Sequence, residues 1–219
     1  MNEKTLEVGC IGLGKFGLCL AQSLTEMGHT VVGVDNSELR VRRAQGELAQ
    51  VFQGDATDKV TLEQLGFAEL DRAVVSVGDS MDSSLLAVMN LQDLGVKNIW
   101  VKAVSPQHEK VLNRLGVEFS VFPEQFAAKE MAHRIAVPGI LDYLSLGEDI
   151  LVREVVVDQW SGRTLIDLAL PKTQSIQVVA TKSAGADTYS FIPDAKKPLL
   201  KGDTLLLLGK AVNIREIES

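Results

Sequence analysis

Three glycines near the N-terminus have the spacing with the clearest chemical meaning: Gly12, Gly14 and Gly17 form the pattern Gly-X-Gly-X-X-Gly. The apolar run Val8–Ile11 precedes them directly, and a helical pattern follows. In this setting the first glycine permits a tight turn, the second lets a pyrophosphate approach the backbone, and the third allows helix and strand to pack closely. Free N–H groups at the helix start can then bind phosphate oxygens. The turn is therefore predicted to bind phosphate groups.

An acidic residue ends the next apolar run. Asp35 stands 18 residues after Gly17, where a carboxylate can accept hydrogen bonds from the ribose hydroxyls of adenosine and would repel a 2′-phosphate. The alternative is that Asp35 only caps the helix that begins at Asn36 or Ser37. We favour ribose binding because turn, strand and carboxylate occur together, and we assign Asn36 and Arg40 to the same site.

Two residues inside the glycine turn, Lys15 and Phe16, are also assigned to the site. The Lys15 ammonium can reach a terminal phosphate, which suits a nucleotide with a free phosphate end better than a dinucleotide. It can equally be a solvated side chain of the first helical turn, and the sequence leaves both interpretations open.

Further candidates follow later strands, because ligands gather at the carboxyl ends of parallel strands. These candidates are Asp55, Ala56, Thr57, Gly78 and Lys102. For the side chains of Asp55 and Ser80, capping of the following helices is the favoured role.

The elements that must position these residues alternate regularly through residues 1–137. Strand-like runs cover Leu6–Ile11, Thr30–Val34, Gln50–Phe52, Ala73–Val77, Ile99–Lys102 and Phe119–Val121. Helical patterns lie between them, near 15–27, 37–47, 58–65, 80–94, 106–114 and 124–136. Parallel neighbours require crossover helices, so this order predicts an α/β fold with a Rossmann-like, doubly wound parallel sheet.

The pattern changes near residue 138. Residues 138–150 are predicted to form a connector or hinge helix, with Val137, Pro138 and Gly139 as hinge candidates. Within it, residues 140–146 fit either a short apolar helix or an extended connector. Residues 151–219 are rich in strands, with one helix near Leu165–Leu168 that Pro171 is expected to end. We therefore predict a second, smaller mixed α/β domain over 151–219.

Composition excludes several classes of protein. The chain has 219 residues, 22 basic against 29 acidic, and a net charge of -7, which disfavours a nucleic-acid binder. Its apolar runs are too short for a spanning helix, and residues 1–8 do not resemble a signal peptide. Two cysteines are too few for a disulfide scaffold. We expect a soluble, intracellular protein.

Catalysis has little support in the sequence. A dehydrogenase needs a proton-transfer group beside its cofactor, and none of the histidines lies in a recognisable constellation. His29 is expected in a surface turn, His108 on the polar face of a helix, and His133 in the last helix of the first domain. A small NAD-dependent oxidoreductase remains the alternative. A redox-sensing transcription factor is disfavoured, because no helix-turn-helix or basic face is evident.

Several segments together resemble the cytosolic regulatory subunits of bacterial Trk/Ktr potassium uptake systems, built from a regulator-of-potassium-conductance domain with two lobes. The resemblance is closest to the Ktr type and covers essentially the whole chain. It is carried by residues 8–17, 27–35, 54–57, 98–103, 122–124, 162–165 and 201–205.

The resemblance implies that the N-terminal lobe binds ATP, ADP or NAD(H) without consuming it. Gly12, Gly14 and Gly17 would hold the phosphates and Asp35 the ribose. Asp55, Ala56 and Gly78 would surround the adenine. It also implies a homodimer that assembles into a ring, with an octamer expected. That ring would dock on a membrane potassium channel subunit, which places the protein in the cytoplasm, peripheral to the inner face of the cell membrane.

Two further ligands are implied by the resemblance. Glu124 matches an acidic position that lies near the phosphates at the dimer contact and helps to hold a divalent cation, Mg²⁺ or Ca²⁺. Lys102 would lie near the phosphates or the neighbouring subunit. The alternative for Glu124 is an ordinary acidic residue in a first helical turn. Some members bind cyclic di-AMP in the C-terminal lobe.

This chain departs from the common Ktr pattern at two positions. Lys15 replaces an arginine, which keeps the charge but loses a bidentate fork for the terminal phosphate. Asp55 stands where asparagine is common, and its extra negative charge could shift preference toward NAD(H) or away from a triphosphate.

Overall fold

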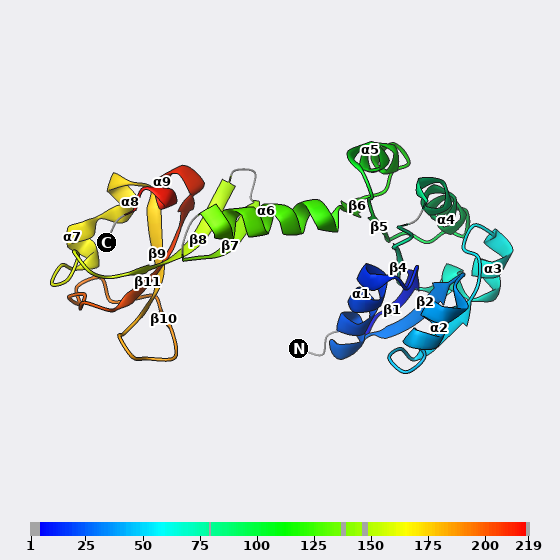
Figure 1. Ribbon diagram of the computed structural model, residues 1–219, viewed down its shortest axis with the longest axis horizontal. Coiled ribbons are helices and arrows are strands. Elements are labelled where there is room, and N and C mark those ends of the chain that lie inside the picture. Colours follow the sequence, from blue (N-terminus) through cyan, green and yellow to red (C-terminus); the bar gives the residue numbers. More distant parts are fainter. Residues whose placement is uncertain (1–4, 79, 137–138, 146–148, 218–219) are drawn as a thin grey trace. The chain divides into compact units, whose positions relative to one another are not determined.

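The computed structural model describes residues 5–78, 80–136, 139–145 and 149–217. Contacts within the chain divide it into two units, Met1–Glu124 and Gln125–Ser219 (Figure 1). The division falls in the first turn of a helix, whereas the sequence analysis places the boundary after residue 137. Each unit has its own buried apolar core.

The first unit is built on a six-stranded parallel sheet with the order β3-β2-β1-β4-β5-β6. Its strands are β1 (Glu7–Ile11), β2 (Thr30–Asp35), β3 (Gln50–Gln53), β4 (Arg72–Val75), β5 (Ile99–Lys102) and β6 (Phe119–Val121). The chain reverses direction across the sheet between β1 and β4, and such a switch point leaves a crevice at the carboxyl ends of the strands. The Rossmann-like fold predicted from the sequence is confirmed.

Helices cover both faces of this sheet (Figure 1). They are α1 (Lys15–Glu26), α2 (Glu38–Ala44), α3 (Lys59–Gln64), α4 (Met81–Asp93) and α5 (Pro106–Arg114), with a 3-10 turn η1 (Phe67–Glu69). One apolar cluster joins Leu18 and Ala44 of α1 and α2 to one face, and another joins Leu62, Leu91 and Leu112 of α3, α4 and α5 to the other. Since both faces are covered, the central strands β1, β2 and β4 are buried without alternation.

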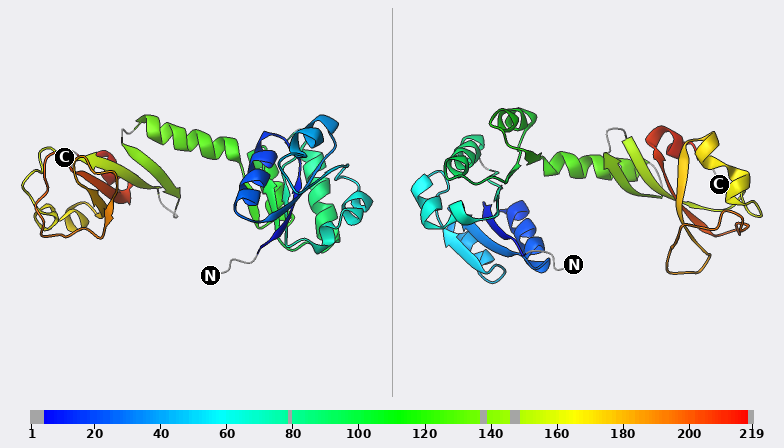
Figure 2. Two further views of the ribbon diagram at one scale, coloured as in Figure 1. Left: turned by 90° about the horizontal axis from the view of Figure 1, so that it is seen from below. Right: turned by 180° about the vertical axis from the view of Figure 1, so that it is seen from behind.

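The second unit holds a five-stranded antiparallel sheet with the order β10-β9-β11-β8-β7 (Figure 2). The helix α6 (Pro123–Ala136) precedes it. The other elements are β7 (Ile140–Ser145), β8 (Asp149–Val156), α7 (Leu165–Leu168), α8 (Leu170–Thr173), β9 (Ile176–Lys182), β10 (Ser190–Phe191), β11 (Thr204–Lys210) and α9 (Ala211–Arg215). Leu205 and Leu207 of β11 are buried while their neighbours are half-buried, which is the period of two expected for a sheet covered on one face. The short helices pack on that face.

Two expectations for this region need correction. Of the two alternatives for residues 140–146, the helix is wrong and the extended one is right: residues 140–145 form strand β7, because the backbone pairs with β8, as where Tyr143 stands opposite Leu151. A helix this short is marginal by itself, whereas a strand gains ladder hydrogen bonds. Pro171 does not end α7, which stops at Ala169 in a left-handed conformation, and Pro171 lies inside α8.

The expected hinge is described only at Gly139, since Val137 and Pro138 lie outside the described residues. The Gly139 carbonyl accepts a hydrogen bond from the Glu154 N–H at 2.8 Å. The described part of the hinge candidate is therefore tied to the sheet of the second unit.

Candidate functional site

The glycine turn connects β1 to α1 at the switch point of the parallel sheet. Gly12 has a φ of +91°, and a Cβ there would lie 2.8 Å from the Ser76 carbonyl. A Cβ on Gly17 would overlap the Gly12 carbonyl oxygen. Both positions therefore require glycine, as the sequence pattern predicts.

The start of α1 offers backbone N–H groups to an anion. Its N-cap residue is Gly14, which provides no side-chain cap, and Lys15 is exposed at the first helical position. A helix N-terminus without a side-chain cap satisfies its N–H groups with water or a ligand. A nucleotide phosphate therefore fits the turn.

Asp35 fixes this turn in place from the end of β2. Its buried carboxylate accepts hydrogen bonds from the Leu13 N–H at 2.7 Å and the Ser37 N–H at 2.8 Å. Its Oδ2 also lies 3.5 Å from a guanidinium nitrogen of Arg40. The carboxylate thus binds both the glycine turn and the residue before α2. It does not cap that helix, whose N-cap is Ser37, so the capping alternative for Asp35 is wrong. Ribose binding by Asp35 stays a prediction.

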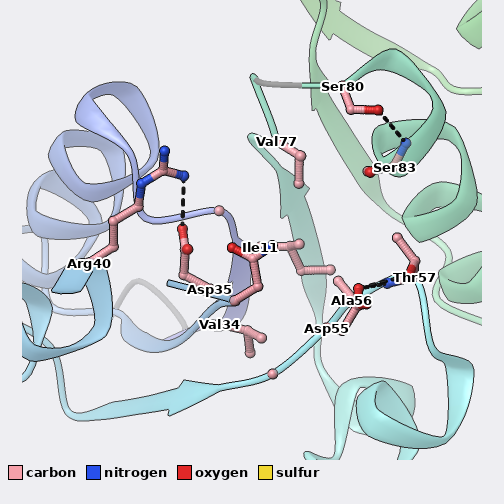
Figure 3. A pocket seen from close by; sticks show the side chains of 13 residues that line it. Ile11, Val34, Asp35, Arg40, Asp55, Ala56, Thr57, Val77, Ser80 and Ser83 are labelled. Carbon is pink, nitrogen blue, oxygen red and sulfur yellow. Dashed lines mark hydrogen bonds and ion pairs between the residues drawn. The ribbon is translucent and has the colours of Figure 1, made fainter. Parts of the chain in front are cut away.

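A cavity of about 280 Å³ opens at the carboxyl ends of these strands (Figure 3). It brings together seven residues assigned from the sequence: Gly12, Asp35, Asn36, Arg40, Asp55, Ala56 and Thr57. Six residues that were not assigned line it too: Ile11, Val34, Gly54, Val77, Ser80 and Ser83. Ile11 and Val34 lie at the ends of strands, and Gly54 and Val77 follow strands closely, so strand ends were the signal that could have found these four. Ser80 and Ser83 belong to the start of α4, where the signal was the cap of that helix. The wall combines apolar side chains with hydroxyl and carboxylate groups, as small-molecule sites do.

Asp55 shapes the loop after β3 and does not cap a helix. Its Oδ1 accepts hydrogen bonds from the backbone N–H of Thr57 at 2.9 Å and from the Thr57 hydroxyl at 2.7 Å. The N-cap of α3 is Asp58, whose carboxylate accepts from the Val60 N–H. The favoured capping role of Asp55 is therefore wrong, because the loop makes one further turn before α3 begins. Ser80 does cap α4, by accepting from the Ser83 N–H.

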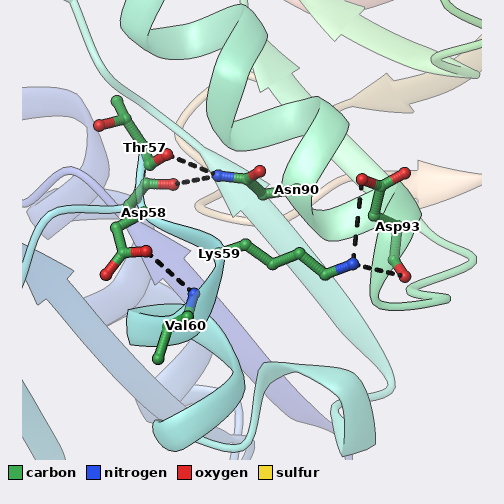
Figure 4. A network of polar contacts seen from close by, with 7 residues as sticks. Thr57, Asp58, Lys59, Val60, Asn90 and Asp93 are labelled. Carbon is green, nitrogen blue, oxygen red and sulfur yellow. Dashed lines mark hydrogen bonds and ion pairs between the residues drawn. The ribbon is translucent and has the colours of Figure 1, made fainter.

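The same loop is held from α4 (Figure 4). The Asn90 side-chain amide donates to the backbone carbonyls of Ala56 at 3.2 Å and Thr57 at 2.9 Å. The Thr61 hydroxyl donates to Asp58 and lowers the pKa of that carboxyl group. This wall of the cavity is thus fixed before any ligand arrives.

Four more predicted residues form a second group, which we call the lysine cluster: Phe16, Gly78, Lys102 and Glu124. The Lys102 ammonium lies 2.8 Å from Glu124 Oε1 and 5.8 Å from the centre of the Phe16 ring. A Cβ on Gly78 would stand 3.9 Å from Lys102 Nζ. Lys102 lowers the pKa of Glu124 through this hydrogen bond. The cluster borders the cavity, because Phe16 follows the turn and Gly78 follows the lining residue Val77.

His108 is buried, contrary to the expectation of a polar helix face. Its Nδ1 accepts a hydrogen bond from the Val104 N–H at 3.3 Å, and the residue has no exposed surface. Within the described residues, its Nε2 is one of two buried side-chain polar atoms that have no hydrogen-bond partner, with Ser84 Oγ. Burial lowers the pKa of His108.

Comparison with known proteins identifies the chain. The model of the TrkA-N domain family matches residues 8–123. Ktr system potassium uptake protein C of Bacillus subtilis is 34% identical over 97% of this chain and 96% of its own length. Ktr system potassium uptake protein A of Vibrio alginolyticus is 32% identical over 95% of this chain and 94% of its own. This chain belongs to the TrkA-N family and is of the Ktr type. The resemblance stated from the sequence is confirmed.

Solved structures agree on the fold of this Ktr-type chain. The GsuK channel matches 98% of the chain with a TM-score of 0.63 and 16% identity, and the chain covers 39% of that longer protein. The structure of its RCK domain alone matches with a TM-score of 0.61. At such identities the likeness establishes the architecture, a Rossmann-like domain followed by a smaller one.

Two other features of the Ktr-type chain bear on its ligands and surroundings. Among the residues that the structure describes, no group of three or more histidine, cysteine or acidic side chains is arranged to hold a metal ion. No helix in the described ranges combines the length and the apolar character needed to cross a bilayer.

Proposed function

We propose that this Ktr-type chain is a non-catalytic, nucleotide-sensing subunit of a potassium uptake system. One observation carries the proposal: an uncapped glycine turn and a cavity with a fixed, partly polar wall meet at the switch point of the sheet, in a chain related to Ktr proteins along its whole length. The ligand is ATP, ADP or NAD(H). A solved structure of similar fold is the GsuK channel bound to NAD, which supports NAD(H) as one of the candidate ligands.

Assembly completes the proposal. We infer a homodimer that builds a larger ring, with eight copies expected, and that docks on a membrane potassium channel subunit from the cytoplasmic side. The helix α6 supports pairing, because none of its described side chains is buried and Phe126, Met131 and Ile135 are exposed. A ligand can gate the channel only if it binds one arrangement of the subunits better than another.

Two finer ligand assignments belong to the same proposal. Glu124 holds a divalent cation, Mg²⁺ or Ca²⁺, at the contact between two copies. The second unit takes cyclic di-AMP in an apolar groove of about 370 Å³ lined by residues of α7, α8 and β9, including Ile166, Pro171 and Val178. Adenine faces suit such a surface. Binding of each compound to the full chain by calorimetry tests both assignments.

The deciding experiment is a titration of the full chain with ATP, ADP, NADH and NAD, read by calorimetry and by the mass of the assembly in light scattering. We expect binding and a ligand-dependent change in assembly. An unoccupied site with every compound would refute the proposal. Hydride transfer from NADH to carbonyl substrates at enzyme-like rates would instead favour an oxidoreductase.

Lys15 gives this titration an internal comparison. Lys15→Ala is expected to weaken ATP binding about tenfold and NADH binding less, because the ammonium meets a terminal phosphate that NADH lacks. Calorimetry with both ligands measures the ratio. Equal losses would assign Lys15 a general electrostatic role.

A further inference from the structure

The two partners of the ion pair in the lysine cluster differ in their exposure. The Lys102 side chain is 15% exposed, whereas that of Glu124 is 61% exposed. A largely buried ammonium group is costly to leave without an anion, since it has lost most of its hydration. Glu124 can return to water at little cost. Lys102 therefore requires an anion nearby, but the anion need not be Glu124.

The position of Lys102 determines which other anion is available. Its ammonium lies beside Phe16 in the first turn of α1, and beside Gly78, which follows the cavity wall at Val77. Glu124 approaches from the first turn of α6. The ammonium thus lies between the phosphate-binding turn and the start of the helix that leaves the first unit.

We propose that Glu124 is a built-in competitor for phosphate at Lys102. A nucleotide phosphate in the glycine turn takes the ammonium from Glu124, and loss of the ion pair releases the first turn of α6. The exchange favours phosphate, because a di- or triphosphate carries more charge than one carboxylate and the start of α1 stabilises it further. This inference rests on the proposed function, since it requires a nucleotide in the turn.

The exchange gives Glu124 a role in communication between the units. It is the last residue of the first unit, and Gln125 begins the second. Phosphate occupancy is therefore passed to the part of α6 where the chain leaves the nucleotide-binding unit. The displaced carboxylate also becomes available for the divalent cation proposed above.

The competition between Glu124 and phosphate predicts that removing the Glu124 charge tightens nucleotide binding. With divalent cations removed by EDTA, Glu124→Gln is expected to tighten ADP and ATP binding about three- to tenfold, because Lys102 no longer has to give up a carboxylate. Lys102→Gln is expected to weaken both by a similar factor or more, while adenosine binding is unchanged in either variant. Glu109→Gln makes the same change in the first turn of α5 and should leave every affinity unchanged.

The test uses the full chain, calorimetry for affinity, and hydrogen exchange of residues 127–130 for the state of α6, because their N–H groups bond to the carbonyls of its first turn. In the wild type, ADP should raise exchange there. Glu124→Gln should show raised exchange without ligand and no further response. The proposed competition would be refuted if Glu124→Gln bound ADP as the wild type does, or more weakly, in EDTA. It would also be refuted if ADP left the hydrogen-exchange rate in α6 of the wild type unchanged. Failure of the wild type to bind any nucleotide would instead refute the proposed function, so the two failures are distinguishable.

Discussion

The cavity of the first unit and the groove of the second are similar in size but opposite in construction. The cavity lies where parallel strands end together, so backbone N–H groups, carboxylates and hydroxyls converge on it. The groove lies on an antiparallel sheet beside short helices, and most of its lining is apolar. Neighbouring antiparallel strands end at opposite edges, so their polar ends do not converge. Sheet topology thus decides that the first unit can recognise charge while the second offers shape and apolar surface.

Backbone strain is also distributed unequally. In the described part of the chain, the non-glycine residues with positive φ are Ala169, Ser175 and Ile192, all in the second unit. In the first unit positive φ occurs at glycines such as Gly12. The first unit therefore places glycine wherever its turns need it, whereas the second unit retains strain close to its groove.

The largest effect is expected from adding one carbon to the glycine turn. In Gly17→Ala the new Cβ overlaps the Gly12 carbonyl, so α1 has to move away from β1. We expect a loss of about 2–4 kcal/mol in the free energy of unfolding of the first unit, measured in urea, and loss of nucleotide binding.

Gly14→Ala is the matched control for this turn. A Cβ there meets no atom within 4 Å, and its φ of -67° suits alanine. It should keep stability, whereas nucleotide binding should weaken, because the new Cβ stands where a pyrophosphate approaches the backbone. If Gly14→Ala lowered the free energy of unfolding as much as Gly17→Ala, the close packing of helix and strand would not explain the third glycine.

One buried carboxylate in each unit allows stability and nucleotide binding to be compared between the units. Asp35 ties the glycine turn to α2, and Asp203 accepts hydrogen bonds from the N–H groups of Ala184 and Leu200. Asp35→Ala and Asp203→Ala should each lower stability by about 2–3 kcal/mol, because buried N–H donors lose their acceptor. Only Asp35→Ala should weaken nucleotide binding by calorimetry. A similar loss of affinity in Asp203→Ala would show that the site depends on the second unit.

Acid should weaken the first unit through His108. Burial lowers the pKa of His108 in the folded chain, so the unfolded chain binds the proton more readily. Its contribution to stability is therefore complete above the unfolded pKa near 6.5 and is lost as the pH falls below it. Between pH 7.5 and 5.5 we expect a loss of about 1 kcal/mol that is absent in His108→Asn, which keeps an acceptor for the Val104 N–H. Equal pH profiles for the two proteins in urea unfolding would contradict this.

His108 and Asp35 also show how far the sequence could lead. The glycine turn, the six strands of the first sheet and the candidate residues at the strand ends follow from local patterns, because strand ends meet in any doubly wound sheet. The burial of His108 could not be predicted from its helix alone, since it depends on packing between elements distant in the chain. The pairing of Lys102 with Glu124 joins β5 to α6, and β7 exists because β8 lies beside it. Such long-range partners leave no local signal.

The smallest effect is expected at Ile192, where strain and groove meet. Ile192 has a φ of +58°, lines the groove and is 93% exposed, so it gains little from burial to offset an unfavourable conformation for a β-branched side chain. Asparagine tolerates this conformation, so Ile192→Asn should raise the stability of the second unit by about 1 kcal/mol. Ile166→Asn makes the same chemical change in the same groove, but in helix α7, and should not stabilise the second unit.

Trp160 fluorescence in a Trp100→Phe background measures the unfolding of the second unit alone, since these are the two tryptophans of the chain. Equal gains from both substitutions would mean that polarity, and not backbone strain, sets the stability of the groove. If only Ile192→Asn raised the stability of the second unit, and if it also weakened cyclic di-AMP binding, the strained conformation of Ile192 would serve ligand binding.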